Sequence, residues 1–335
     1  MIRIINKRVL QMDIIRAISI LAVVLIHVSA LIIYRSGFDS NMCKLSIIIN
    51  QISRFSVPAF ILISGIGLTL SFKEDEGYFK FIKHRFNKII PSYILWCVIY
   101  TYYTTRSFEI NNLINSIIHG SAFYHLYYIP LIIEFYLVYP FIHRVIGTKW
   151  GLLISFLLTF GIIVFTRYYT MSNEIKWFLD KKNLLDWIFY FSFGAFIAKN
   201  MERCLILTKK YRNLIVILFL ISTYIVVNDC MSSLKLGKDI EYAVNFMRPS
   251  VFIYSVFMIL FIFSIQWEKN IFLNIINYIS KSSYSIYLSH AIILDYLVIY
   301  YSKNSLSLVS AAFVIKAFFA AVIGSMLINE GKKYL

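Results

Sequence analysis

The chain has 335 residues, of which 59% are hydrophobic and 18% aromatic, with a mean hydropathy of +0.72 and a formal charge of +16. That much apolar surface excludes an ordinary soluble globular protein. The positive charge does not indicate nucleic-acid binding, because Lys and Arg lie between apolar segments rather than on one soluble basic face.

Ten apolar segments approach the roughly 20 residues that cross about 30 Å of hydrocarbon. We therefore predict an all-α, polytopic membrane protein with about ten transmembrane helices, and we expect residues 1–335 to form a single transmembrane domain. The segments are 12–34, 46–72, 90–105, 126–146, 151–168, 184–200, 212–229, 244–266, 283–301 and 306–328.

Basic residues collect in alternate connections, as in the N-terminus and the stretches from Lys73 to Lys88 and from Lys199 to Arg212. The positive-inside rule then predicts a multi-pass protein of the cell membrane with both termini in the cytoplasm. The first segment is not a signal peptide, because its apolar run is too long and other apolar segments follow. The four cysteines lack metal-ligand spacing, so we predict no metal site.

The first segment carries Asp13, Arg16 and His27 along one stripe. Arg16 and His27 lie about three helical turns apart, which places both side chains on one face and separates them by roughly 16 Å along the axis. An ionisable residue inside a spanning helix is costly unless it has a partner or water, and is a functional candidate by default. A packing role for a neutral His27 also fits the pattern.

Later segments add polar candidates at comparable depth. With the expected topology, His27, Arg54 and Glu134 lie roughly 10–13 Å below the outer surface, and His290 lies nearer the middle. These side chains can converge on one water-filled cavity. Alternatively, Glu134 only neutralises a neighbouring cation, and Arg54 and Arg248 extend their charges to the outer surface.

A second group of cations lies at the cytoplasmic edge, where Arg85 and Lys88 join Arg16. Their forked and point charges suit phosphate oxygens, so a phosphorylated carrier such as an acyl-coenzyme A fits this level. Alternatively, Arg85 and Lys88 are ordinary basic residues at the cytoplasmic end of a helix, as the positive-inside rule expects. The His290-x4-Asp295 spacing is set aside, because on a continuous helix these residues point about 140° apart.

Five motifs in order resemble the acyltransferase-3 family of integral membrane proteins. Lys88 stands where the third motif has a second Arg, so the charge remains but the bidentate fork is lost. The motifs are Asp13-x-x-Arg16 with His27, Phe55–Gly65, Arg85–Pro91, His125–Pro130 with Glu134–Tyr136, and Ser283–His290.

The resemblance implies transfer of an acyl group, usually acetyl, from cytoplasmic acetyl-CoA to a hydroxyl of a surface polysaccharide or lipid-linked glycan. The chain is similar to the stand-alone type of this family. In the mechanism that we hypothesise, His27 acts as general base or acyl carrier, with Glu134 or His290 orienting it and Arg54 polarising the oxyanion. The residues expected to hold the coenzyme A phosphates are Arg16 with Asp13 beside it, Arg85 and Lys88.

A transporter or flippase that exports a glycan or an acyl-bearing solute is the competing interpretation, because polar residues at mid-depth also line transport pathways. Two expected absences count against it: the sequence has no evident inverted repeat and no paired helices broken by Gly or Pro.

Overall fold

The computed structural model describes residues 10–107, 109–169, 183–267 and 271–331, and every regular element in them is helical. The all-α prediction is therefore confirmed for this part of the chain. The N-terminal cations Arg3, Lys7 and Arg8, on which part of the topology prediction rests, lie outside the described residues.

Within the described residues, eight spans are long and apolar enough to cross a bilayer, which makes this a multi-pass membrane protein. Two of the ten expected segments are not among the eight. Residues 90–105 form the last part of α4 (Tyr78–Thr105), and residues 184–200 divide into the short η1 (Leu184–Asp186) and α9 (Ile188–Lys199). Twelve residues of α9 fall short of the length that a crossing needs.

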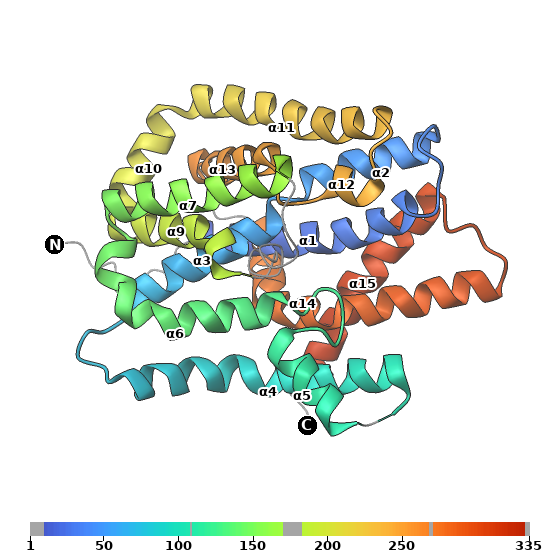
Figure 1. Cartoon of the computed structure of the whole chain (residues 1–335), viewed down its shortest axis with the longest axis horizontal. Helices are drawn as coiled ribbons and strands as arrows, with labels where there is room; N and C mark the ends of the chain where they lie inside the picture. The colour runs from blue at the N-terminus through green and yellow to red at the C-terminus, as the bar shows by residue number, and fades with distance from the viewer. Residues whose placement is uncertain (1–9, 108, 170–182, 268–270, 332–335) are drawn as a thin grey trace. The chain divides into compact units, whose positions relative to one another are not determined.

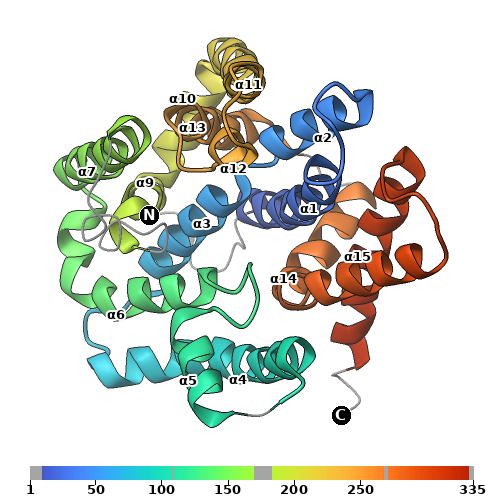
Figure 2. The same ribbon diagram turned by 45° about the vertical axis from the view of Figure 1, so that its right-hand side comes forward.

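The described residues form two compact units. The first, here called the terminal unit, joins the residues up to Ile63 to those from Glu202 on. Its α1 packs against α2, α13, α14 and α15, while α11 lies beside α13, and α14 beside α15 (Figures 1 and 2). The helices are α1 (Leu10–Ile33), α2 (Asn41–Ile52), α10 (Met201–Lys210), α11 (Arg212–Lys235), α12 (Ile240–Val244), α13 (Pro249–Ser264), α14 (Ile271–Lys303) and α15 (Ala311–Gly331).

The second, here called the central unit, covers Ser64–Met201. Its α4 contacts α5 and α6, and α7 packs against both α6 and α9 (Figure 1). The helices not yet given are α5 (Ile110–His119), α6 (Tyr128–Ile146) and α7 (Lys149–Tyr168), while α3 (Ser56–Ser71) begins in the terminal unit and ends in the central one.

The stretch from Lys73 to Lys88 was expected to be a connection between helices, but only its first part is one. Helix α4 begins at Tyr78, so Arg85 and Lys88 lie on its early turns. The reason is that Lys and Arg are good helix formers, and a helix readily continues beyond the apolar part of its sequence.

Two of the spans in the terminal unit are interrupted. Helix α2 ends at Ile52 and α3 begins at Ser56, and α12 ends at Val244 before α13 begins at Pro249. Arg248 is extended, as a residue before proline must be. The expectation concerned paired breaks made by Gly or Pro in matching halves, and only the second of these breaks has a Pro beside it. The first break contains no Gly or Pro, so a search for those residues had no signal to find there.

Candidate functional site

The two predicted histidines stack on each other in the terminal unit. The ring centroids of His27 on α1 and His290 on α14 are 5.2 Å apart, with 30° between the ring planes. His290 is fully buried, and its Nδ1 lies 2.9 Å from the carbonyl oxygens of both Ile286 and Tyr287. A carbonyl only accepts, so Nδ1 carries the proton and Nε2 carries the lone pair. The continuous course of α14 through His290 and Asp295 agrees with setting that spacing aside.

Arg54 lies in the break between α2 and α3, and its charge acts on His27. The same guanidinium acts on Tyr34, directly after α1. Burial raises the pKa of the Tyr34 phenol, the Glu241 carboxylate raises it further, and Arg54 opposes both. Tyr34 therefore stays protonated at neutral pH.

Asp13 and Arg16 form an ion pair at the contact between α1 and α14. Arg16 Nη1 lies 3.4 Å from Asp13 Oδ1, and Ser280 Oγ donates to that same carboxylate oxygen at 2.9 Å. The Asp13 side chain is 3% exposed, whereas that of Arg16 is 33% exposed. Asp13 thus holds Arg16 in place, and the Arg16 side chain stays partly exposed.

A polar network that the sequence analysis missed begins beside His27. Asn50 Nδ2 donates to the carbonyl oxygen of Ile26 and to Ser29 Oγ, both at 3.0 Å. Gln51 Nε2 in turn donates to Asn50 Oδ1 at 3.2 Å. Asn50 and Gln51 are buried on α2, so this network ties α2 to the turn of α1 that carries His27.

The network continues to Arg248, which is 0% exposed. Arg248 donates to Gln51 Oε1, to Asp229 Oδ2 at 2.8 Å and to the carbonyl oxygen of Asn245 at 2.7 Å. Ser250 Oγ also donates to Asp229 Oδ2. The suggestion that Arg248 extends to the outer surface was wrong, because a guanidinium with three acceptors has no need of bulk water. An adjacent polar pair in an apolar segment, and an Arg directly before Pro249, were the available signals.

The two breaks meet within the terminal unit. Tyr254 Oη on α13 donates to the carbonyl oxygen of Ile52 at 2.6 Å, and so satisfies one of the carbonyls that α2 leaves open at its end. Arg248, at the start of α13, bonds Gln51 in the last turn of α2. Interrupted spans with satisfied ends are the form in which membrane proteins place irregular backbone at a buried site.

In the central unit, Arg85 is ordered by its neighbours. Its Nη2 donates to Ser71 Oγ at 2.5 Å, and its guanidinium carbon lies 5.3 Å from the centroid of the Phe81 ring. Lys88 is exposed. The two members of the predicted phosphate motif therefore differ: Arg85 is held in place before any ligand binds, whereas Lys88 is exposed and makes no such contact among those described.

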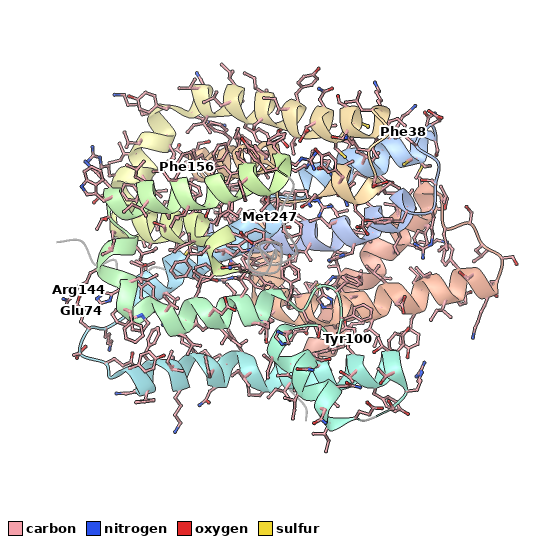
Figure 3. The ribbon with its side chains drawn as sticks, in the orientation of Figure 1. Phe38, Glu74, Tyr100, Arg144, Phe156 and Met247 are labelled. Carbon is pink, nitrogen blue, oxygen red and sulfur yellow. The ribbon has the colours of Figure 1, made fainter. Side chains whose placement is uncertain are left out.

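Further polar contacts in the central unit involve Glu74, which lies between α3 and α4, and the end of α6. His143 Nε2 lies 3.3 Å from Glu74 Oε1, and Arg144 Nη2 lies 3.9 Å from Glu74 Oε2, as Figure 3 shows for the labelled pair. Lys199 Nζ donates to the carbonyl oxygen of His143 at 2.9 Å.

Glu134 lies on α6 in a pocket of about 250 Å³ within the central unit. The pocket lies between α4, α5 and α6, and its other lining residues are mostly apolar, among them Ile90, Ile117 and Pro130. Tyr93, which also lines the pocket, donates from its hydroxyl to the carbonyl oxygen of Ile117 at 2.6 Å. The convergence of Glu134 on His27 stays a prediction.

Comparison with known proteins adds a family match. Residues 9–330 match a family model described as "Acyltransferase domain" of acyltransferase-3 type. A Staphylococcus aureus (strain Mu50) protein named "Probable poly-beta-1,6-N-acetyl-D-glucosamine export protein" is 27% identical over 305 residues, covering 87% of this chain and 84% of the relative. A protein of the same name from Staphylococcus epidermidis is 25% identical over 312 residues, covering 88% and 84%. No solved structure matches.

Proposed function

Because the chain belongs to the acyltransferase-3 family, we propose that it transfers an acyl group, acetyl in the first instance, from cytoplasmic acyl-CoA to a hydroxyl of a cell-surface or lipid-linked glycan. In this proposal the whole chain is one transferase domain, and both termini are cytoplasmic. The donor then enters from the inner side and the acceptor from the outer side of the membrane.

The stacked pair of His27 and His290 is the observation that carries the proposal. Two imidazoles inside a multi-pass membrane protein are expensive to bury, and such groups are kept where they do chemistry. The His27 side chain stays partly exposed, whereas His290 is buried and its Nδ1 donates to two backbone carbonyl oxygens. This favours His27 as the group that meets the substrate and His290 as the group that orients it.

The reaction needs one base and one oxyanion stabiliser. His27 removes the proton from the sugar hydroxyl, whose oxygen attacks the thioester carbonyl. The carbon–sulfur bond then breaks, and the coenzyme A thiolate takes up the proton held on His27. Arg54 stabilises the negative charge on the carbonyl oxygen as the tetrahedral intermediate forms. The alternative sequence, in which His27 itself accepts the acyl group before the sugar does, uses the same residues.

In this proposal, cationic side chains bind the acyl-CoA donor. Arg16 is accessible and held by Asp13 in the terminal unit, and Arg85 is held by Ser71 in the central unit. Arg guanidinium groups suit phosphate oxygens, and the exposed Lys88 adds a mobile charge. Glu134, in its own apolar pocket, remains a candidate carboxylate of the reaction.

The acceptor is proposed from the printed names of the relatives, which refer to poly-β-1,6-N-acetyl-D-glucosamine. A β-1,6-linked N-acetylglucosamine oligosaccharide is therefore the first acceptor to test. The purified protein is reconstituted into vesicles with radiolabelled acetyl-CoA on one side and the oligosaccharide on the other. We expect label to appear on the oligosaccharide, and His27→Ala to reduce transfer by at least about hundredfold. Full transfer by a folded His27→Ala protein would exclude both roles of His27.

Export of a glycan is the second candidate. The interrupted spans α2–α3 and α12–α13 favour it, because broken helices at mid-depth build substrate sites in transporters. The same vesicles separate the two functions. Movement of unlabelled oligosaccharide across the membrane without acetyl-CoA supports export, whereas esterified oligosaccharide that stays on its own side supports transfer.

A further inference from the structure

We propose that Arg248 is a positioning residue for His27, acting through Gln51 and Asn50. This inference rests on the proposed function, since it assigns a role toward the proposed base. Arg248 touches neither histidine in any contact described above. Its effect passes through side chains of α2 to the backbone turn from which His27 projects.

The path from Arg248 to His27 is made of directed hydrogen bonds. Arg248 Nη2 donates to Gln51 Oε1, Gln51 Nε2 donates to Asn50 Oδ1, and Asn50 Nδ2 donates to the carbonyl oxygen of Ile26. Ile26 directly precedes His27. Because an amide side chain has one donor end and one acceptor end, the orientation of Gln51 sets that of Asn50.

The local backbone of α1 needs such support. Ser29 Oγ donates to the carbonyl oxygens of Leu25 at 2.6 Å and Ile26 at 3.0 Å, and Asn50 bonds both Ser29 and Ile26. Side chains that bond carbonyls three or four residues back bend helices. The turn around His27 therefore has a conformation that Asn50 can fix, and the direction of the imidazole follows from that turn.

The far end of the path is anchored rigidly. Arg248 is fully buried and bonds Asp229 on α11 and the backbone of Asn245, while Ser250 bonds the same Asp229 oxygen. A buried ion pair is weak evidence of stabilisation, because its desolvation cost can equal its attraction, but it does enforce one geometry. That property suits a group that positions another.

Two substitutions of Gln51 separate positioning from anchoring. Gln51→Met removes the acceptor for Arg248 and the donor to Asn50. Gln51→Glu keeps an acceptor for Arg248 and loses only the donor. If the path positions His27, both variants lower kcat by about tenfold to hundredfold, the size expected for a misplacement of about 1 Å, while KM for acetyl-CoA stays within about twofold.

The control is Ser255→Ala on α13, which removes a buried hydroxyl that bonds only within its own helix to Val251 in the described contacts. It is expected to leave kcat unchanged. A second measurement does not depend on transfer: carbethoxylation of His27 by diethyl pyrocarbonate, followed by peptide mass spectrometry, is expected to change at least twofold in rate in both Gln51 variants and in Arg248→Lys.

A wild-type kcat and wild-type His27 labelling in Gln51→Glu would overturn the positioning role and leave Arg248 as an anchor only. His27→Ala, measured in parallel, tests the proposed function itself. Loss of transfer in His27→Ala together with full activity in both Gln51 variants means that only the further inference has failed. Full transfer in His27→Ala means that the proposed base has failed, whatever the labelling shows.

Discussion

The ion pairs described in the terminal and central units differ in how deeply they are buried. In the terminal unit Arg248, Asn50, Gln51 and His290 are all buried, and hydrogen bonds run between helices. In the central unit the ion pair of Arg144 and Glu74 is exposed, and Lys88 is exposed as well. Buried networks fix geometry, and accessible cations bind mobile anions. On the proposed function, we infer from this difference that the terminal unit holds the reacting groups and the central unit helps to hold the donor.

Breaking one ion pair in each unit gives the largest contrast. Arg248→Met leaves Asp229, whose side chain is 35% exposed, without its buried partner, and we expect a loss of about 3 kcal/mol of unfolding free energy. Arg144→Met removes an exposed pair with side chains 79% and 68% exposed, and about 0–1 kcal/mol is expected. Unfolding titrations with SDS in mixed micelles measure both. Adding Asp229→Asn to Arg248→Met is expected to recover part of the loss, and equal losses in the two single variants would contradict the contrast.

His290→Phe tests whether the histidine pair does more than pack. Phenylalanine keeps an aromatic ring beside His27 but removes both nitrogens, so the backbone bonds of Nδ1 and the lone pair of Nε2 disappear together. We expect kcat for transfer to fall by about hundredfold, with the protein still folded. Ser289→Ala is the matched control, because Ser289 is buried on the same helix and bonds only Ser285 in the described contacts. Undiminished transfer by His290→Phe would reduce the pair to a packing contact.

The sequence was sufficient to predict eight of the spans and the histidines, because both depend on local signals. An apolar run predicts a span, and an ionisable residue inside it stands out against its neighbours. His27 and His290 were identified in this way. The structure brings their rings together, although the roles assigned to them are still to be tested.

The network around Arg248 could not be predicted because its partners are distant in sequence. Gln51 and Arg248 are 197 positions apart, so no periodicity links them. A lone Arg near the end of a segment has two physical outcomes, burial with partners or extension to the surface, and only the tertiary contacts decide between them. The same limit applies to Arg85, whose contact with Ser71 depends on how α3 meets α4.

Two glycines of α3 sharpen the picture of the central unit. A Cβ added at Gly65 would overlap the carbonyl oxygen of Phe191 on α9, whereas one added at Gly67 would meet nothing within 4 Å. Gly65→Ala is therefore expected to cost about 1–3 kcal/mol through overpacking. Gly67→Ala is expected to cost nothing, and can gain up to about 1 kcal/mol of helix propensity. Thermal unfolding in detergent distinguishes the two, and equal melting temperatures would contradict the close approach of α3 to α9.

The smallest expected effect concerns the two cations of the donor motif. Arg85 is already held by Ser71 and Phe81, so a phosphate gains its charge-assisted bonds without first ordering the side chain. The exposed Lys88 must give up as much as about 2 kcal/mol of rotamer freedom to bind, which offsets most of its attraction. We expect Arg85→Gln to raise KM for acetyl-CoA by about tenfold and Lys88→Gln by less than about twofold, with kcat unchanged in both. Raising the salt concentration should weaken donor binding in the wild type more than in Arg85→Gln, because the variant has lost the charge that salt screens. If Lys88→Gln raised KM as much as Arg85→Gln, pre-ordering by Ser71 would not be what distinguishes the two cations.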